Sequence, residues 1–136
     1  MTDLFGATQN LTIKVCEVGP FLAMKLRAFA RRQQPKDAFD LLYTLRHYDK
    51  GTEAAIAAFA EEVRLNNPAC PDAVRCLEQE FASENAPAPV KAAHFVLGQV
   101  TPGENKDLRT RRLQIQQDMV DAGRMLRAAV DGVSGV

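Results

Sequence analysis

The sequence predicts a mainly α-helical protein of about six helices, preceded by one short β-strand. Three observations predict this fold class. Several segments begin with proline and carry apolar residues three and four positions apart. Only one segment shows the alternation that is typical of a strand, and loops rich in Pro, Gly and Asn separate the segments. The chain has 136 residues, of which 46% are hydrophobic and 25% charged. This size and composition predict a single helical domain, residues 1–136, with a modest core.

The predicted strand is LTIKVCEV at residues 11–18, in which Leu11, Ile13 and Val15 would share one face. A lone strand leaves backbone groups without partners, so it needs a neighbour that the chain does not obviously supply. Three outcomes are open. The strand pairs with another chain, it pairs with a copy of itself in a homo-oligomer, or residues 1–19 form an extended arm.

A helix pair over residues 20–48 follows this arm. Its first helix is expected from Pro20 to about Arg32, and Pro35 opens the second helix. Both prolines would occupy the first turn, where their missing N–H costs nothing. The remaining helices would fill residues 52–130, with expected ranges of 52–65, 71–82, 89–97 and 106–130.

The last of these helices carries two residues that break its pattern. Its apolar side chains follow a three-four spacing, but Arg112 interrupts the seam and Gly123 weakens the helix locally. The pattern therefore argues against a long coiled coil. Arg109, Arg111 and Arg112 form a basic cluster, which neighbouring acidic residues offset, so a solvated helix face is the favoured interpretation.

Charge is distributed unevenly along a chain whose formal net charge is zero. A neutral chain is unlike general polyanion-binding proteins, so an RNA-binding adaptor is the less favoured function. Residues 22–50 nevertheless hold seven Lys and Arg against three Asp, whereas residues 51–89 hold two Arg against seven Asp and Glu. A phosphate site is therefore expected in the first of these regions.

The expected location is the cytoplasm, with no membrane association. No apolar run approaches the roughly 20 residues that a spanning helix needs. The start of the chain, MTDLFGATQN, lacks the basic and apolar regions of a signal peptide. Three cysteines without a recognisable spacing are typical of reduced thiols, and they do not predict zinc.

One lysine stands out in the first helix of the pair because it lies in the middle of an apolar face. The predicted face comprises Phe21, Leu22, Lys25, Leu26, Ala28, Phe29 and Arg32. Arg27 and Arg31 would point the other way and be ordinary solvated charges. Burying an unpaired ammonium costs several kcal/mol, so Lys25 needs a partner.

The second helix offers that partner on its polar stripe. Asp37 and Asp40 are three residues apart and therefore lie on one side of the helix. A short loop would bring this stripe near Lys25 and Arg32. Two interpretations remain open at this point. The charges are a structural ion pair, with Asp37 also favoured by the helix dipole, or they form a functional site.

The spacing of these residues resembles a known family. Residues 25–41 read K-L-x-A-x(3)-R-x(3)-K-D-x(2)-D-L, after a strand, a turn and a helix start. This is similar to the carboxy-terminal signature of the AbiEii/AbiGii-type nucleotidyltransferase toxins, and the clear resemblance covers residues 11–48. It implies the fold of the C-terminal part of an α+β nucleotidyltransferase.

The resemblance implies transfer of a nucleotide from an NTP with Mg²⁺, in a toxin–antitoxin or phage-defence system. Lys25 and Arg32 would bind the triphosphate, and Lys36 would be a further phosphate contact. Asp37 and Asp40 would be the catalytic residues, orienting the cations or assisting the transfer. A cognate antitoxin is the implied partner.

The sequence departs from the family in one respect. Such enzymes begin with a Gly-Ser element and an Asp-x-Asp/Glu strand that holds the catalytic Mg²⁺, and neither pattern occurs here. We therefore expect no complete metal site in this chain, and weak or no activity without the N-terminal metal-binding half. That half would be a separate second chain, or it has been lost. The alternative is a non-catalytic helical protein-interaction module, a remnant of such an enzyme.

Overall fold

The computed structural model describes residues 18–134, and this part of the chain is entirely helical apart from its loops. Six helices are present, which confirms the mainly α prediction: α1 (Val18–Arg32), α2 (Pro35–His47), α3 (Thr52–Arg64), α4 (Cys70–Glu80), α5 (Pro87–Leu97) and α6 (Lys106–Ser134). The predicted strand lies outside the described residues except for Val18. That residue opens α1, two positions before Pro20, so the expected helix start at Pro20 is wrong. Proline is tolerated in the first turn, and the helix therefore begins before it.

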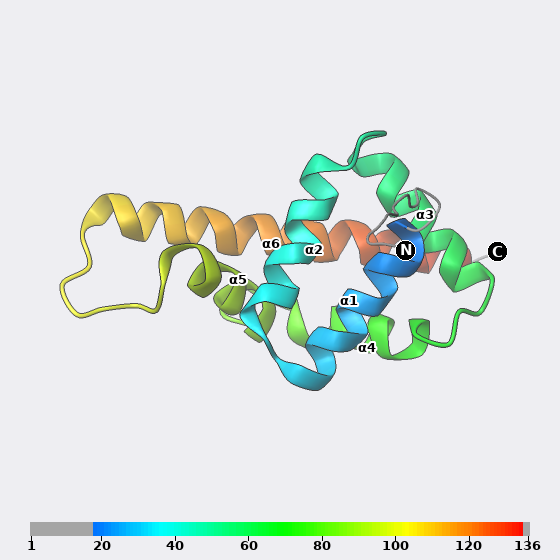
Figure 1. Cartoon of the computed structure of the whole chain (residues 1–136), viewed down its shortest axis with the longest axis horizontal. Helices are drawn as coiled ribbons and strands as arrows, with labels where there is room; N and C mark the ends of the chain where they lie inside the picture. Colours follow the sequence, from blue (N-terminus) through cyan, green and yellow to red (C-terminus); the bar gives the residue numbers. More distant parts are fainter. Residues whose placement is uncertain (1–17, 135–136) are drawn as a thin grey trace, which may run out of the picture.

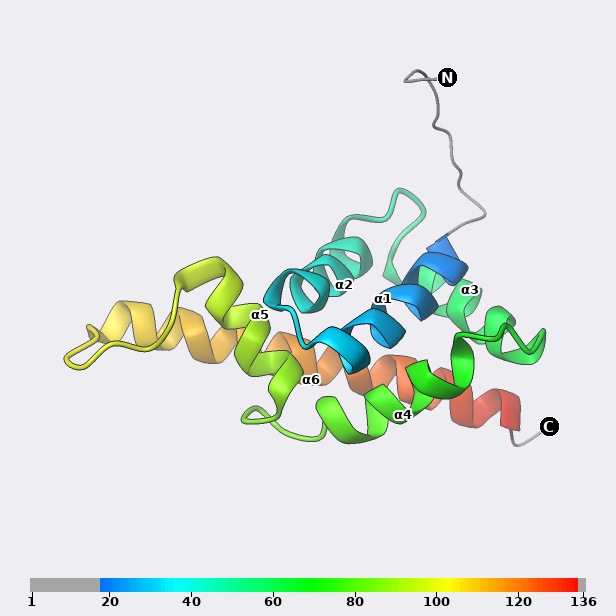
Figure 2. The same ribbon diagram turned by 60° about the horizontal axis from the view of Figure 1, so that its bottom comes forward.

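The long helix α6 runs along the whole length of the molecule (Figure 1). Helix α5 lies beside the first half of α6, and the loop after α5 forms one end of the molecule. Helices α1 and α2 lie across the core from α6 (Figure 2). Within residues 18–134, no helix combines the length and the apolar character that crossing a bilayer requires.

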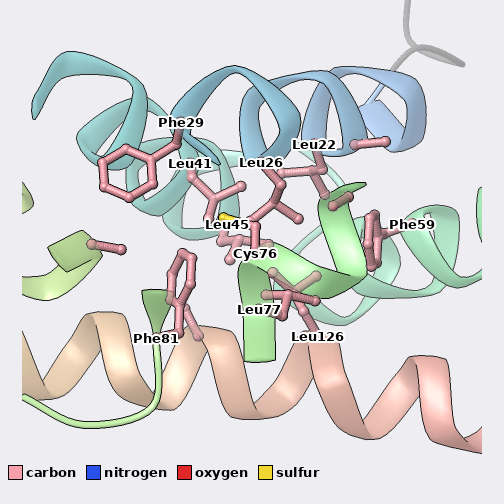
Figure 3. Packing of buried hydrophobic residues seen from close by; sticks show 14 of the residues in the cluster. Leu22, Leu26, Phe29, Leu41, Leu45, Phe59, Cys76, Leu77, Phe81 and Leu126 are labelled. Atoms are coloured by element: carbon pink, nitrogen blue, oxygen red, sulfur yellow. The ribbon is translucent and has the colours of Figure 1, made fainter. Parts of the chain in front are cut away.

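The core lies between the α1–α2 pair and α6, and Figure 3 shows its side chains pointing inward from all sides. Helix α1 packs on α2, α3 and α4, so it is covered over more of its circumference than one apolar face predicts. Ala23, which does not belong to the predicted apolar face, is consequently buried. Phe21 and Arg32 are exposed, although both were placed on the buried face. The large side chains with almost no exposure are Leu22, Leu26, Phe29, Leu41, Leu45, Phe59, Met119 and Leu126.

Gly123 of α6 lies against the side chain of Phe81. A Cβ added to Gly123 would lie 2.8 Å from the Cβ and Cδ2 atoms of Phe81. The glycine that locally weakens the helix is thus needed for packing. Phe81 follows α4 directly and is buried, so its ring has little freedom to move.

We expect Gly123→Ala to lower the free energy of unfolding by about 1–2 kcal/mol, because overpacking exceeds the gain in helix propensity. Gly132→Ala is the matched control in the same helix, since a Cβ there meets nothing within 4 Å. It should raise stability by up to about 1 kcal/mol. Urea unfolding followed by circular dichroism measures both. Equal effects at the two positions would contradict the proposed steric role of Gly123.

Candidate functional site

The candidate site depends on a tight reversal between α1 and α2. Gln33 adopts a left-handed backbone conformation with φ of 55°, and its N–H donates to the Phe29 carbonyl oxygen at 2.8 Å. Its side chain amide reaches both the same carbonyl and Glu80 of α4, each at 3.1 Å. Gln33 therefore fixes the turn, and α2 returns along α1 in roughly the opposite direction (Figure 1).

This reversal brings three cations and two carboxylates into one network. Lys25 Nζ donates to Asp37 Oδ1 at 3.2 Å and to Asp40 Oδ2 at 2.9 Å. Arg32 donates to the second oxygen of Asp37 at 2.8 Å, and Lys36 donates to Asp40 at 2.8 Å. Each carboxylate thus bridges two cations. The predicted approach of the aspartate stripe to Lys25 and Arg32 is confirmed.

The side chains of this network differ in their exposure to solvent. The Asp37 side chain is only 4% exposed and the Lys25 side chain 21%, whereas that of Arg32 is 60% exposed. Lys36 is exposed as well. Because three cations face two carboxylates, one positive charge is in excess. The charged ends of Arg32 and Lys36 are exposed, so this excess positive charge lies at the surface, where an anion can reach it.

Contacts within the network favour the charged forms of Lys25 and Asp40. Burial by itself favours neutral Lys25, but hydrogen bonds and charges from Asp40 and Asp37 outweigh it and raise the lysine's pKa. Burial likewise opposes the charged form of Asp40, yet hydrogen bonds from Lys36 and Lys25 lower its pKa below the usual value. Lys25 is therefore a permanent ammonium, suited to binding an anion and unsuited to acting as a base or nucleophile.

Asp72 of α4 organises a second charged cluster that the sequence did not predict. Its carboxylate lies 3.2 Å from Arg31 and 3.1 Å from Arg75, and the Arg27 Nε atom is 3.6 Å away. Arg31 is exposed, as a solvated charge would be, but the expectation did not include the contacts of Arg27 and Arg31 with Asp72. The packing of α4 on α1 places Asp72 against these two arginines. The sequence signal for this contact was the opposite net charge of residues 22–50 and residues 51–89.

Arg112 is also placed differently from the expectation. Its side chain is buried and donates to both carboxylate oxygens of Glu104, at 3.2 and 2.7 Å, and to the Gly98 carbonyl at 2.8 Å. The guanidinium lowers the pKa of Glu104, which keeps the pair ionised. Arg112 therefore ties the α5–α6 loop to α6, and it does not belong to a solvated basic face.

The aspartates do not fit a resident magnesium site. Mg²⁺ requires oxygen ligands in near-octahedral geometry, but the Lys25 ammonium occupies the position between the two carboxylates. Within residues 18–134, no three His, Cys, Asp or Glu side chains are grouped so that they could hold a metal ion. The network can therefore orient and neutralise an anion, but it cannot position a divalent cation with these carboxylates alone.

We compared the chain with models of protein families, with curated proteins and with solved structures. A family model described as nucleotidyl transferase AbiEii toxin, type IV toxin–antitoxin system, matches residues 1–131. This match extends well beyond residues 11–48, over helices in which the sequence shows no recognisable signature. No curated protein and no solved structure matches the chain.

Proposed function

Since the chain belongs to the AbiEii nucleotidyl transferase toxin family of type IV toxin–antitoxin systems, we propose that its α1–α2 network binds the triphosphate of an NTP. The observation that carries this proposal is the Lys25 ammonium, held between two carboxylates beside two exposed cations. In this proposal Lys25 and Arg32 contact phosphate oxygens and Lys36 adds a third contact. Asp37 and Asp40 hold these cations in position and assist the transfer.

The arrangement suits phosphate chemistry for electrostatic reasons. Nucleotide transfer depends mainly on positioning the phosphates and stabilising charge, because the protein itself forms few covalent bonds. The fork of Arg32 matches a phosphate in a way that a lysine cannot, and Asp37 holds that fork in one orientation. Lys25 adds a point charge that the network keeps protonated.

In this proposal, the catalytic Mg²⁺ depends on carboxylates outside the α1–α2 network. A second chain that carries the metal-binding half would supply them, and the family also implies a cognate antitoxin. When bound, magnesium would supply electrostatic stabilisation of the phosphate charge. The chain by itself would then bind NTP but transfer nucleotides weakly. Transfer at ordinary enzymatic rates by the purified chain with Mg²⁺ would contradict this part of the proposal.

A second candidate function, a protein-interaction module, is favoured because every charge of the network is already paired. All five side chains already have opposite-charge partners without any ligand. Such a network can simply fasten α2 to α1, and the chain would then be a non-catalytic helical module that binds a partner protein. The two functions differ in one measurable property, because only the first predicts NTP binding by the chain.

Adjacent arginines provide a matched test of the first function. Arg31 and Arg32 have nearly equal exposure, 59% and 60%, but Arg31 faces Asp72 of α4 and Arg32 faces Asp37. We expect Arg32→Ala to weaken NTP binding roughly tenfold or more, since a charge-assisted hydrogen bond is lost. Arg31→Ala removes the same charge and should change affinity no more than about twofold, a screened surface effect.

Isothermal calorimetry with Mg²⁺ and each NTP is the measurement. Equal losses of NTP affinity in the two variants would show that binding depends only on the net charge of α1. Absence of NTP binding by the wild type would favour the interaction module.

A further inference from the structure

An exposed aromatic side chain, Phe21, lies beside the proposed phosphate site on α1. Residues four and seven positions apart on a helix lie on the same side, so Phe21, Lys25 and Arg32 follow one line. At 1.5 Å per residue this line is about 16 Å long. It presents an aromatic ring, an ammonium and a guanidinium in that order.

The ring belongs to the site rather than to the core. Its centroid lies 5.6 Å from Lys25 Nζ, within the range of a cation–π contact. Phe21 is 37% exposed and is not among the side chains that form the buried core, unlike its helix neighbours Leu22 and Leu26. Packing alone therefore does not account for a large aromatic residue at this position.

We propose that Phe21 is the platform on which the nucleobase of the bound NTP stacks. This inference rests on the proposed triphosphate site and extends it by one subsite. An NTP presents phosphates, then a sugar, then a flat aromatic base, and the α1 line presents complementary groups in the same order. Phosphates on Arg32 and Lys25 direct the rest of the nucleotide toward Phe21.

The proposed subsite recognises a nucleoside as a class and does not select one base. Stacking is tolerant of sequence because every base has a π-face, and a phenylalanine ring offers no hydrogen bond to distinguish them. All four NTPs should therefore gain affinity over inorganic triphosphate, which has the same phosphates and no base. The expected gain is roughly five- to a hundred-fold.

Calorimetry with ATP, CTP, GTP, UTP and inorganic triphosphate tests this on the full chain. Phe21→Leu keeps an apolar side chain but removes the aromatic face, so it should bind NTP and triphosphate equally. Phe21→Trp should keep the preference for NTP. Val100→Ala is the control, because Val100 is an exposed apolar residue of the loop between α5 and α6, outside the α1–α2 pair.

The outcomes separate this inference from the phosphate site itself. If wild type binds both ligands equally, or if Phe21→Leu keeps the NTP preference, the stacking role is overturned and the phosphate site stands. If wild type binds neither ligand, the phosphate site fails as well. Circular dichroism and urea midpoints confirm that each variant is folded, which the exposure of Phe21 favours.

Discussion

Replacing Lys25 with methionine should abolish detectable NTP binding. The substitution keeps the apolar stem and removes the one cation that contacts both carboxylates. Two cations would then face two carboxylates, so the excess positive charge that attracts phosphate disappears. Lys50→Met removes the same charge from an exposed position after α2 and should leave affinity nearly unchanged. Binding by Lys25→Met within a few-fold of wild type would assign Lys25 a structural role only.

The same substitution should also reduce stability, and a double variant separates the two effects. Without Lys25, the buried Asp37 carboxylate keeps only Arg32, which we expect to cost about 1–2 kcal/mol. This is less than the loss of a fully buried pair, because Lys25 still touches water. Combining Lys25→Met with Asp37→Leu removes the buried charge and should recover most of that stability. NTP binding should not recover, since an apolar pair attracts no phosphate.

The helix pair that carries the site could be predicted because its determinants are local. Pro35 marks a helix start, and the three-residue spacing of Asp37 and Asp40 places both on one side. The Lys25 ammonium on an apolar face needs a carboxylate partner. Because the loop after α1 is short, α2 is the nearest element that can provide one. Each of these arguments uses residues within about twenty positions of one another.

The features that escaped prediction depend on distant packing. Asp72 is 41 residues from Arg31, and the contact exists only because α4 lies against α1. Gly123 meets Phe81, which precedes it by 42 positions and could not be identified as its neighbour from helical spacing. Such pairs follow from tertiary structure, which periodicity within one helix does not encode.

The extent of the family match has a similar explanation. The quoted pattern ends before α3, but the family model covers residues 1–131. The later helices mainly contribute core side chains such as Phe59 and Leu126. A core accepts many apolar residues of suitable volume, so these helices carry no fixed polar pattern that inspection of one sequence can detect.

Asp40→Asn should increase the affinity for inorganic triphosphate, by roughly several-fold to tenfold. The Asp40 carboxylate competes with phosphate for Lys25 and Lys36, both of which donate to the same oxygen. Removing one negative charge at this partly exposed, solvent-screened position is worth roughly 1 kcal/mol in total. Tighter ground-state binding does not by itself accelerate transfer, so the carboxylate remains compatible with an assisting role.

The pH dependence of this variant provides an independent check with a defined sign. The pKa of Asp40 is lowered in the folded protein, so its contribution to stability is present above the ordinary aspartate pKa of 3.8 and is lost as pH falls through the folded pKa. Asp40→Asn should therefore lose less stability than wild type in acid, as measured by urea unfolding between pH 5 and roughly 2. Asp49→Asn, an exposed aspartate after α2, is the control for charge. Weaker triphosphate binding by Asp40→Asn would contradict this prediction, because the loss of alignment of Lys25 and Lys36 would then outweigh the gain in charge.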